Sequence, residues 1–416
     1  MKLKIYRGTG QIGGNVIEIA TDDGKTKILL DCGKNLPPLD DENTPEDIRF
    51  NELTHGTNDY RAVFVTHHHA DHCGLIEQMG SIPIYTSRET EGVLNVIADF
   101  LDKPAVTIEK DNILKPGRKV KVGDISVLPI SVSHSAQGAM MFLVEADNKK
   151  LLYTGDFRQI DWRGRAILKE HEIDAMLCEG TNISASIGMT EEYIETKATE
   201  IMDINKTSGN VLVLCSSTNI DRIKSIENAC IKSGRILAID PFAKAILDRL
   251  GYSLKVDWVG FVPYAITPDK WPRAHRYFMS NIGFFSGGKS MASIAKQKKL
   301  VLMVRQTESM KSFLSAKLKS LESSEMIYSI WKGYEKTAKT RGFIEHCQAL
   351  GMNQLRTDSY LHTSGHIYRD ALEETIGWIR PKALIPIHTE NADAFKGLHD
   401  NLIIEEVSNG EEWQVP

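Results

Sequence analysis

The stretch Arg61-Ala-Val-Phe-Val-Thr-His-His-His-Ala-Asp-His72 decides how this chain of 416 residues is interpreted. Its first half is an apolar run typical of a buried strand, and its second half holds four histidines and an aspartate. Alternate residues of an extended loop project to one side, so His67 and His69 can reach one cation while Asp71 and His72 face a second position. Imidazole and carboxylate suit zinc and similar metals. The stretch therefore predicts a strand that ends at a metal site; an exposed polar loop is the alternative that the strand context disfavours.

Three further residues of metal-ligand type also follow strand-like runs. His134 comes after the run that starts at Ile125, Asp156 follows Lys150-Leu-Leu-Tyr-Thr, and His388 follows Ile385-Pro-Ile. Each alone would fit a core histidine or a turn aspartate equally well. Together with the first loop they complete two groups of three ligands, and Asp156 is placed to bridge both. Coordination positions left open for water are typical of catalytic metal sites.

The composition describes a globular protein, with 42% hydrophobic and 25% charged residues. No apolar run approaches the roughly 18 residues needed to span a bilayer. The basic start is not followed by an apolar stretch, so neither a secretory signal nor a membrane span is expected. The six cysteines form no CxxC pair. This favours reduced thiols in a cytoplasmic protein over a disulfide framework or a thiolate zinc site.

Charge and strand pattern divide the chain into blocks. Residues 196–355 carry 24 Lys and Arg against 13 Asp and Glu, a net of +11, while the remainder carries −16. The basic block suits a polyanionic partner, with a merely solvated surface as the alternative. Its strand-then-helix alternation predicts a parallel sheet, whereas short strands and histidine loops fill the regions on either side. We therefore expect an α/β domain, 1–194 and 356–416, that is interrupted by an inserted α/β domain, 195–355.

Further motifs narrow the family. The histidine and aspartate motifs resemble the metallo-β-lactamase fold, and Glu179-Gly-Thr-Asn, Ser217-Thr-Asn-Ile-Asp-Arg222 and His362-Thr-Ser-Gly-His366 resemble its β-CASP branch of nucleases. A glycine-rich opening, Gly8-Thr-Gly-Gln-Ile-Gly-Gly-Asn15, is similar to that of ribonuclease J. The resemblance covers nearly the whole chain. It implies an αββα metallo-β-lactamase sandwich with an inserted parallel α/β, or β-CASP, domain.

The resemblance also implies roles for individual residues. The last helical stretch is expected from Ile367, so a helix N-cap turn is the alternative interpretation of Ser364-Gly-His. Arg222 is expected to face the cleft, and Lys296-Gln-Lys-Lys299 is a second candidate contact for a nucleic-acid backbone. The metal ligands are His67, His69, Asp71, His72, His134, Asp156 and His388; the catalytic residues are Asp71, Glu179 and His366; the substrate-binding residues are His362, Thr363, Ser364, Gly365, His366 and Arg222.

The activity implied is that of a metal-dependent ribonuclease of the ribonuclease J type, which cleaves endonucleolytically, from the 5′ end, or in both ways. A hydroxide activated by two divalent ions would hydrolyse the RNA phosphodiester bond. Zinc is the expected metal and manganese the alternative. The expected setting is a cytoplasmic protein with single-stranded RNA as partner and no membrane, and a homodimer is the candidate assembly. The alternatives are a DNA or other phosphodiesterase of the same fold and a non-catalytic nucleic-acid-binding homologue.

Overall fold

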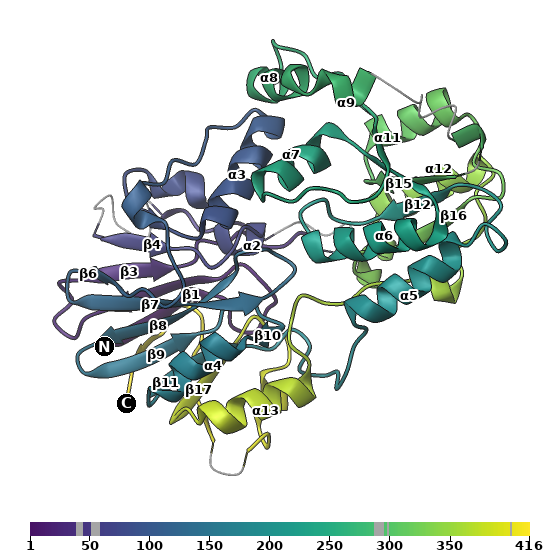
Figure 1. The fold of residues 1–416 in the computed structure, drawn as a ribbon. Coiled ribbons are helices and arrows are strands. Elements are labelled where there is room, and N and C mark those ends of the chain that lie inside the picture. The colour runs from purple at the N-terminus through teal and green to yellow at the C-terminus, as the bar shows by residue number, and fades with distance from the viewer. Residues whose placement is uncertain (39–44, 51–58, 287–294, 298, 400–401) are drawn as a thin grey trace.

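The computed structural model describes residues 1–38, 45–50, 59–286, 295–297, 299–399 and 402–416 of this α/β protein. Two β-sheets lie face to face, and a third, with helices of its own, lies beside them (Figure 1). Lys298, part of one expected basic patch, falls outside the described residues. Within the described part, no helix is both long and apolar enough to cross a membrane.

The two stacked sheets are built from strands at both ends of the chain. The first has the order β19-β1-β2-β3-β4-β5, and the second has the order β10-β7-β8-β9-β11-β17-β18 with β6 paired to β7. The strands of the first are β1 (Lys2–Arg7), β2 (Val16–Ala20), β3 (Lys27–Leu30), β4 (Ala62–Phe64), β5 (Ile84–Tyr85) and β19 (Glu412–Gln414). Those of the second are β6 (Val120–Val122), β7 (Ile125–Ser133), β8 (Met140–Ala146), β9 (Lys149–Tyr153), β10 (Gln159–Ile160), β11 (Ala175–Glu179), β17 (Ala383–Ile387) and β18 (Ile403–Ile404).

Apolar side chains fill the space between the stacked sheets and both of their outer faces. Leu3 and Phe64 of the first sheet share one buried core with Phe142 and Leu177 of the second. The outer face of the second sheet packs on α4 (Trp162–Lys169) and α13 (Arg369–Ile379). The outer face of the first packs on α2 (Ala70–Cys73) and α3 (Arg88–Leu101). Two sheets enclosed by helices in this way form the expected αββα sandwich.

The third sheet is a five-stranded sheet in which every neighbouring pair is parallel, in the order β14-β13-β15-β12-β16. The sequence predicted β12, β13 and β15 but not the two edge strands. Gly234 ends α6 in left-handed backbone at φ 66°, as expected of a C-cap. The elements are β12 (Val211–Leu214), β13 (Ile236–Ile239), β14 (Trp258–Gly260), β15 (Leu300–Val304), β16 (Glu325–Tyr328), α5 (Glu191–Met202), α6 (Ile220–Ser233), α7 (Pro241–Arg249), α8 (Pro272–Ser280), α9 (Ile282–Ser286), α11 (Glu308–Phe313) and α12 (Ala338–Ala349).

Helices cover both faces of this parallel sheet. Apolar residues of α5, α6 and α7 share one buried core with it, and residues of α11 and α12 share another on the opposite face. We propose the division 1–194, 195–355 and 356–416 for the chain, because all five strands of the third sheet lie between 211 and 328. The first of these boundaries falls inside α5, which packs along α6.

Strand direction brings the ends of six strands to one edge of the sandwich. β3 is parallel to β4 in the first sheet, and β9, β11 and β17 are mutually parallel in the second. β7 runs the same way as β9, because each is antiparallel to β8. The residues that follow these strands therefore lie together at a shared edge. In layered α/β folds such an edge is the usual location of a functional site.

Arg222 links the inserted domain to the segment before His362, where the chain leads back to the sandwich. Its guanidinium is fully buried and forms two hydrogen bonds with the Glu191 carboxylate, at 3.0 and 3.1 Å. It also donates to the carbonyl oxygens of Ser329 and Leu361, each at 3.1 Å. The expectation that Arg222 faces the cleft and contacts substrate is therefore wrong. A buried charge bound to three residues holds α5, α6, the end of β16 and the approach to His362 together.

We expect Arg222→Ala to destabilise the protein, because it leaves Glu191 partly buried without its cation. Removing one partner of a buried ion pair typically costs about 3–5 kcal/mol. The free energy of unfolding, measured by urea titration, should fall by that order. Lys224→Ala on the exposed face of the same helix is the control and should cost less than about 1 kcal/mol. Unchanged stability of Arg222→Ala with a selective loss of RNA affinity would instead restore the substrate-binding role.

Candidate metal centre

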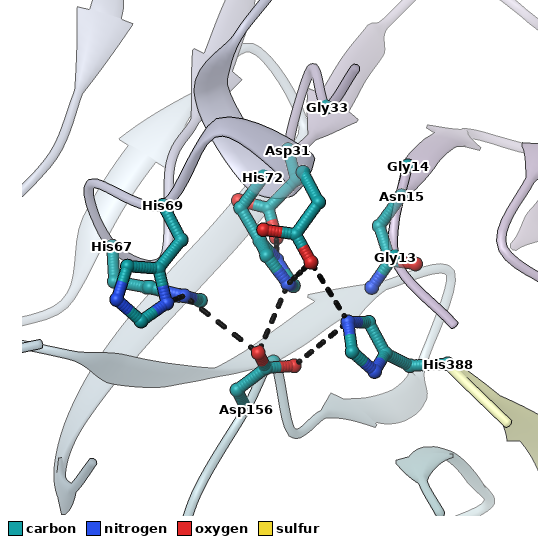
Figure 2. A network of polar contacts seen from close by, with 12 residues as sticks. Gly13, Gly14, Asn15, Asp31, Gly33, His67, His69, His72, Asp156 and His388 are labelled. Carbon is teal, nitrogen blue, oxygen red and sulfur yellow. Dashed lines mark hydrogen bonds and ion pairs between the residues drawn. The ribbon is translucent and has the colours of Figure 1, made fainter. Parts of the chain in front are cut away.

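The loops at the shared edge direct seven metal-ligand side chains toward one another. The His67–His72 loop follows β4, His134 follows β7, Asp156 follows β9 and His388 follows β17. Figure 2 shows His67, His69, His72 and His388, from both sheets, arranged around Asp156. All except His69 are buried. The sandwich itself therefore positions the candidate ligands.

One group consists of His67, His69, His134 and Asp156. His67 Nε2 lies 3.0 Å and His134 Nε2 lies 3.2 Å from His69 Nδ1. Asp156 Oδ2 is 3.7 Å from His67 Nε2 and 3.8 Å from His134 Nε2. One ligand atom from each residue thus lies within 4.8 Å of all the others, a spacing that suits a single cation.

The second group consists of Asp71, His72, His388 and again Asp156. His388 Nε2 lies 3.2 Å from Asp71 Oδ2, and His72 Nε2 lies 3.2 Å from Asp156 Oδ2. The other carboxylate oxygen of Asp156, Oδ1, is 3.6 Å from His388 Nε2. Asp156 therefore belongs to both groups, which are the two groups expected from the sequence.

Hydrogen bonds on the far side of the rings orient these histidines. Asp31 Oδ2 accepts from His72 Nδ1 at 2.7 Å, and the carbonyl oxygen of Gly365 accepts from His134 Nδ1 at 2.7 Å. Each bond places the proton on Nδ1 and leaves the Nε2 lone pair directed at the group. Thr181 Oγ1 contacts His388 Nδ1 at 2.8 Å in the same manner. Partners of this kind fix ring orientation in metal sites.

Sequence reasoning missed Asp31 and Thr181. Asp31 is fully buried and also accepts hydrogen bonds from the Thr66 amide and the Tyr153 hydroxyl, at 2.7 and 2.6 Å. The available signal was an aspartate directly after the apolar run Lys27-Ile-Leu-Leu. A single carboxylate after a strand is too common to be assigned a role without the fold.

Two residues of the centre adopt left-handed backbone, Asp31 at φ 58° and His388 at φ 51°. Such conformations cost about 1–3 kcal/mol in residues other than glycine and persist where the surroundings impose them. The His388 amide donates to the Gly8 carbonyl at 2.7 Å, which links the last ligand to the glycine-rich opening. Gly13 of that opening approaches the centre closely, because a Cβ there would lie 2.7 Å from Asp71 Oδ2.

The donor set fits a divalent cation. His72 Nε2 and Asp156 Oδ1 are buried without a hydrogen-bond partner among the described residues. In the first group His67 Nε2 and His134 Nε2 both contact His69 Nδ1, and one ring proton can satisfy only one of these two contacts. Buried polar atoms without partners are costly. Imidazole and carboxylate donors suit zinc and manganese alike.

Electrostatics within the centre favour the protonation states that bind metal, with one exception. Burial lowers the pKa of His67 and of His134 well below the usual value, so both rings are neutral. Burial raises the pKa of Asp156, but the charges of His388 and His72 lower it by more than that. The net pKa lies well below the usual value, so the carboxylate is ionised. Burial likewise lowers the pKa of His72, yet Asp156 and Asp31 raise it well above its usual value. A proton on His72 takes the place of a cation, so metal binding would release it.

Glu179 and His366 form a pair beside the two groups. His366 Nδ1 lies 2.9 Å from Glu179 Oε2 and 3.8 Å from Asp156 Oδ2. Glu179 is fully buried and also accepts from the amide of Phe157 at 3.0 Å. Burial lowers the pKa of His366, but Glu179 and Asp156 raise it more strongly, to about 9. His366 is thus a partly exposed, charge-stabilised imidazole at the open side of the centre.

The segment His362–His366 approaches the centre as an irregular loop. A Cβ on Gly365 would lie 2.6 Å from the ring of His134, so only glycine fits there. Ser364 Oγ accepts from the His366 amide at 3.2 Å. The helix expected from Ile367 begins at Arg369, with Tyr368 as N-cap, so Ser364 does not cap it. Thr363 is buried and points away from solvent.

His362 has an unusual environment for a histidine. Burial, and then the charge of Arg222, lowers its pKa to about 4, so the ring is neutral. Its Nδ1 is buried without a hydrogen-bond partner among the described residues. A neutral imidazole with a spare nitrogen can donate to a phosphate oxygen or accept from water.

Comparison with known proteins agrees with the fold and the site. The family model described as "Beta-lactamase superfamily domain" matches residues 26–201. Ribonuclease J of Sinorhizobium meliloti is 27% identical over 410 residues, covering 92% of this chain and 68% of the relative. Ribonuclease J of Mycolicibacterium smegmatis is 26% identical over 390 residues, covering 87% of this chain and 64% of the relative. The chain thus spans about two thirds of the length of these relatives.

A crystal structure of a protein of unknown function from Enterococcus faecalis V583 has the same fold. It matches with a TM-score of 0.73 and 21% identity, over 99% of both chains. The αββα sandwich and the histidine-rich edge agree with the match of residues 26–201 to the superfamily domain. The similarity to ribonuclease J extends over both the sandwich and the inserted domain.

We expect Asp31→Asn to weaken metal binding without removing a ligand. An amide NH₂ opposite His72 Nδ1 cannot accept its proton, so the ring loses the orientation that directs Nε2 inward. Changes to such orienting partners typically cost about 10- to 100-fold in metal affinity. Competition with a fluorescent chelator measures the affinity.

Tyr153→Phe is the matched control, because it removes another hydrogen bond to the same oxygen of Asp31 and leaves His72 in place. Its effect on metal affinity should be clearly smaller. Equal effects of the two variants would mean that Asp31 acts through general stability rather than through His72.

Proposed function

We propose that this chain is a metal-dependent ribonuclease of the ribonuclease J type, which hydrolyses RNA phosphodiester bonds. The observation that carries the proposal is the convergence of two ligand groups that share Asp156, directly beside the Glu179–His366 pair. The similarity to ribonuclease J over most of the chain supports the same activity.

We propose two metal ions for the centre. His67, His69 and His134 would hold one, and Asp71, His72 and His388 the other, with Asp156 between them. Bound divalent ions supply Lewis-acid chemistry, because they make a water molecule more acidic and neutralise charge on the phosphodiester. Zinc is the proposed metal because all seven donors are imidazole nitrogen or carboxylate oxygen, which suit it, and manganese is the alternative.

Asp71, Glu179 and His366 are the proposed catalytic residues. Asp71 Oδ2 faces His388 and the glycine-rich opening, where its carboxylate can orient the attacking water and accept its proton. His366 lies on the more exposed side, and Glu179 holds the His366 ring by its Nδ1. A protonated His366 can therefore present its Nε2 proton to the leaving oxygen or to a phosphate oxygen.

The His362–Gly365 loop is the proposed substrate-binding segment. Ser364 Oγ accepts a hydrogen bond from the His366 amide, so its own hydrogen remains available for a phosphate oxygen. His362 contributes the neutral imidazole described above. The Gly365 carbonyl orients His134, so this segment connects substrate binding to the candidate ligands.

We further propose single-stranded RNA as the substrate, the cytoplasm as the location and a homodimer as the assembly. The net charge of +11 in the inserted block supports a polyanionic substrate. All six cysteines are buried and free, which supports a reducing compartment. DNA hydrolysis and loss of catalysis are the competing outcomes in the experiment below.

We expect the protein, reloaded with zinc or manganese, to cleave end-labelled single-stranded RNA faster than DNA of the same sequence. His366→Ala should retain its metal and lose about 100- to 10,000-fold in rate, as is typical for a proton-transfer group. Asp71→Ala should lose both metal and activity, because it is a ligand as well. Cleavage is followed on gels and metal content by elemental analysis.

Equal metal loss in the two variants would place His366 among the ligands and contradict its catalytic role. Faster cleavage of DNA would replace the ribonuclease proposal by its phosphodiesterase alternative. No cleavage of either polymer by the metal-loaded protein would favour a non-catalytic homologue.

We expect wild-type protein to hold about two metal ions per chain and His388→Ala to hold about one. His388 closes only the second group, so the His67–His69–His134 group should stay filled. Elemental analysis after gel filtration measures the stoichiometry. His399→Ala is the control, because the His399 ring contacts the Glu373 carbonyl and belongs to neither ligand group. Full occupancy in His388→Ala would show that His388 is not a ligand.

A further inference from the structure

An exposed aromatic pair lies at the end of the inserted domain. Trp331 lies three residues after the end of β16 and is 50% exposed, and Tyr334 is 39% exposed. Their ring centroids are 5.4 Å apart and the planes are nearly perpendicular, at 88°. Large aromatic side chains left in solvent as a cluster typically mark a binding surface.

The same segment carries four exposed cations, Lys332, Lys336, Lys339 and Arg341. None of them forms an ion pair with an acidic side chain among the described residues. Glu335 is the only acidic residue between 331 and 341, and it accepts a hydrogen bond from Tyr360 at 2.6 Å. Lys332, Lys336 and Arg341 line an open hollow of about 480 Å³. Unpaired cations beside aromatics are complementary to a nucleic-acid strand.

Contacts connect this segment to the candidate site. Tyr328 Oη donates to the Trp331 carbonyl at 3.3 Å, and the Leu361 amide donates to the Tyr328 carbonyl at 2.9 Å. Lys332 lies 4.7 Å above the ring of Tyr360, two residues before His362. The pKa of Tyr334 is raised by partial burial and by the negative charge of Asp71.

We propose that residues 331–341 form a base-stacking platform that holds single-stranded RNA beside the metal centre. Trp331 and Tyr334 would stack on bases, and Lys332, Lys336, Lys339 and Arg341 would bind the phosphates between them. The inference rests on the proposed ribonuclease function and deepens it by naming the docking surface. Stacking on a π-face is indifferent to base identity, so the platform should bind RNA of any sequence.

The platform differs from the basic patches expected from the sequence. Arg222 is buried in an ion pair, and Lys296 and Lys299 are exposed without an aromatic partner among the described residues. Cations without a neighbouring ring offer no base-stacking surface, so the platform predicts that these two lysines make no phosphate contact. The pair Lys296 and Lys299 therefore serves as a matched control within the same basic block.

The first test compares Trp331→Ala with Trp162→Ala, a tryptophan that is 73% exposed on α4 of the sandwich. Fluorescence anisotropy with a labelled 12-nucleotide RNA, in chelator to prevent cleavage, measures affinity. Stacking energies predict about a 5- to 150-fold loss for Trp331→Ala. Trp331→Phe should recover most of the affinity, and Trp162→Ala should bind as wild type. Thermal unfolding confirms that all variants are folded.

A small substrate separates failure of the platform from failure of the proposed function. Metal-loaded Trp331→Ala should hydrolyse bis(p-nitrophenyl) phosphate at the wild-type rate, because that substrate does not reach the platform. Cleavage of RNA by wild type with unchanged RNA affinity in Trp331→Ala would overturn the platform and leave the ribonuclease proposal intact. Such a surface would then suit a protein partner. If wild type neither binds nor cleaves RNA, both proposals are wrong.

The second test measures the salt dependence of binding. Each phosphate contact of a single strand contributes about −0.7 to the slope of log K against log salt. The triple variant Lys332→Ala, Lys336→Ala, Lys339→Ala should reduce the magnitude of the slope by about 1–2. Lys296→Ala with Lys299→Ala should leave it nearly unchanged. Equal reductions in the two variants would show diffuse electrostatic attraction and overturn the platform.

Discussion

The crowding of nitrogen and carboxylate donors at the shared edge is the constraint on which this structure depends. His67 Nε2 and His134 Nε2 both lie at hydrogen-bonding distance from His69 Nδ1, where one proton can satisfy only one of them, and two carboxylates are buried beside them. Such an arrangement is unfavourable in the absence of a cation, so the scaffold must impose it. Six strands that end at the same edge, each fixed by a sheet, provide that rigidity. Asp31, Thr181 and the Gly365 carbonyl then set the rotation of single rings.

The inserted domain also helps to position residues of the candidate metal centre. Arg222 binds the carbonyl of Leu361, from which the chain runs directly to His362 and on to His366. Gly365 in that run accepts from His134 of the sandwich. The position of the His362–His366 loop is therefore determined from both domains. A change in how the domains pack would shift His366 relative to Asp156, which lies 3.8 Å away.

Most of the fold and the candidate ligands could be predicted because both follow local patterns. Strands appear as apolar runs, and His67, His134, Asp156 and His388 each stand just past such a run. Asp31 has the same position but no neighbouring motif, so nothing local distinguishes it. Arg222 was misassigned because its partner Glu191 is 31 residues away, and sequence does not reveal that a charge is paired in the interior. The edge strands β14 and β16 were missed because neighbouring strands, rather than their own composition, stabilise them.

The shared carboxylate of Asp156 makes occupation of the two ligand groups a linked equilibrium. Its Oδ2 is the closer oxygen to His67, and its Oδ1 lies 3.6 Å from His388. A cation bound by one group changes the charge and the orientation that this carboxylate offers to the other. Linkage requires the effect to be reciprocal, so each cation alters the affinity for the other by the same factor. With the two proposed cations, the population of the fully loaded state would therefore vary with metal supply more steeply, or less steeply, than for two independent sites.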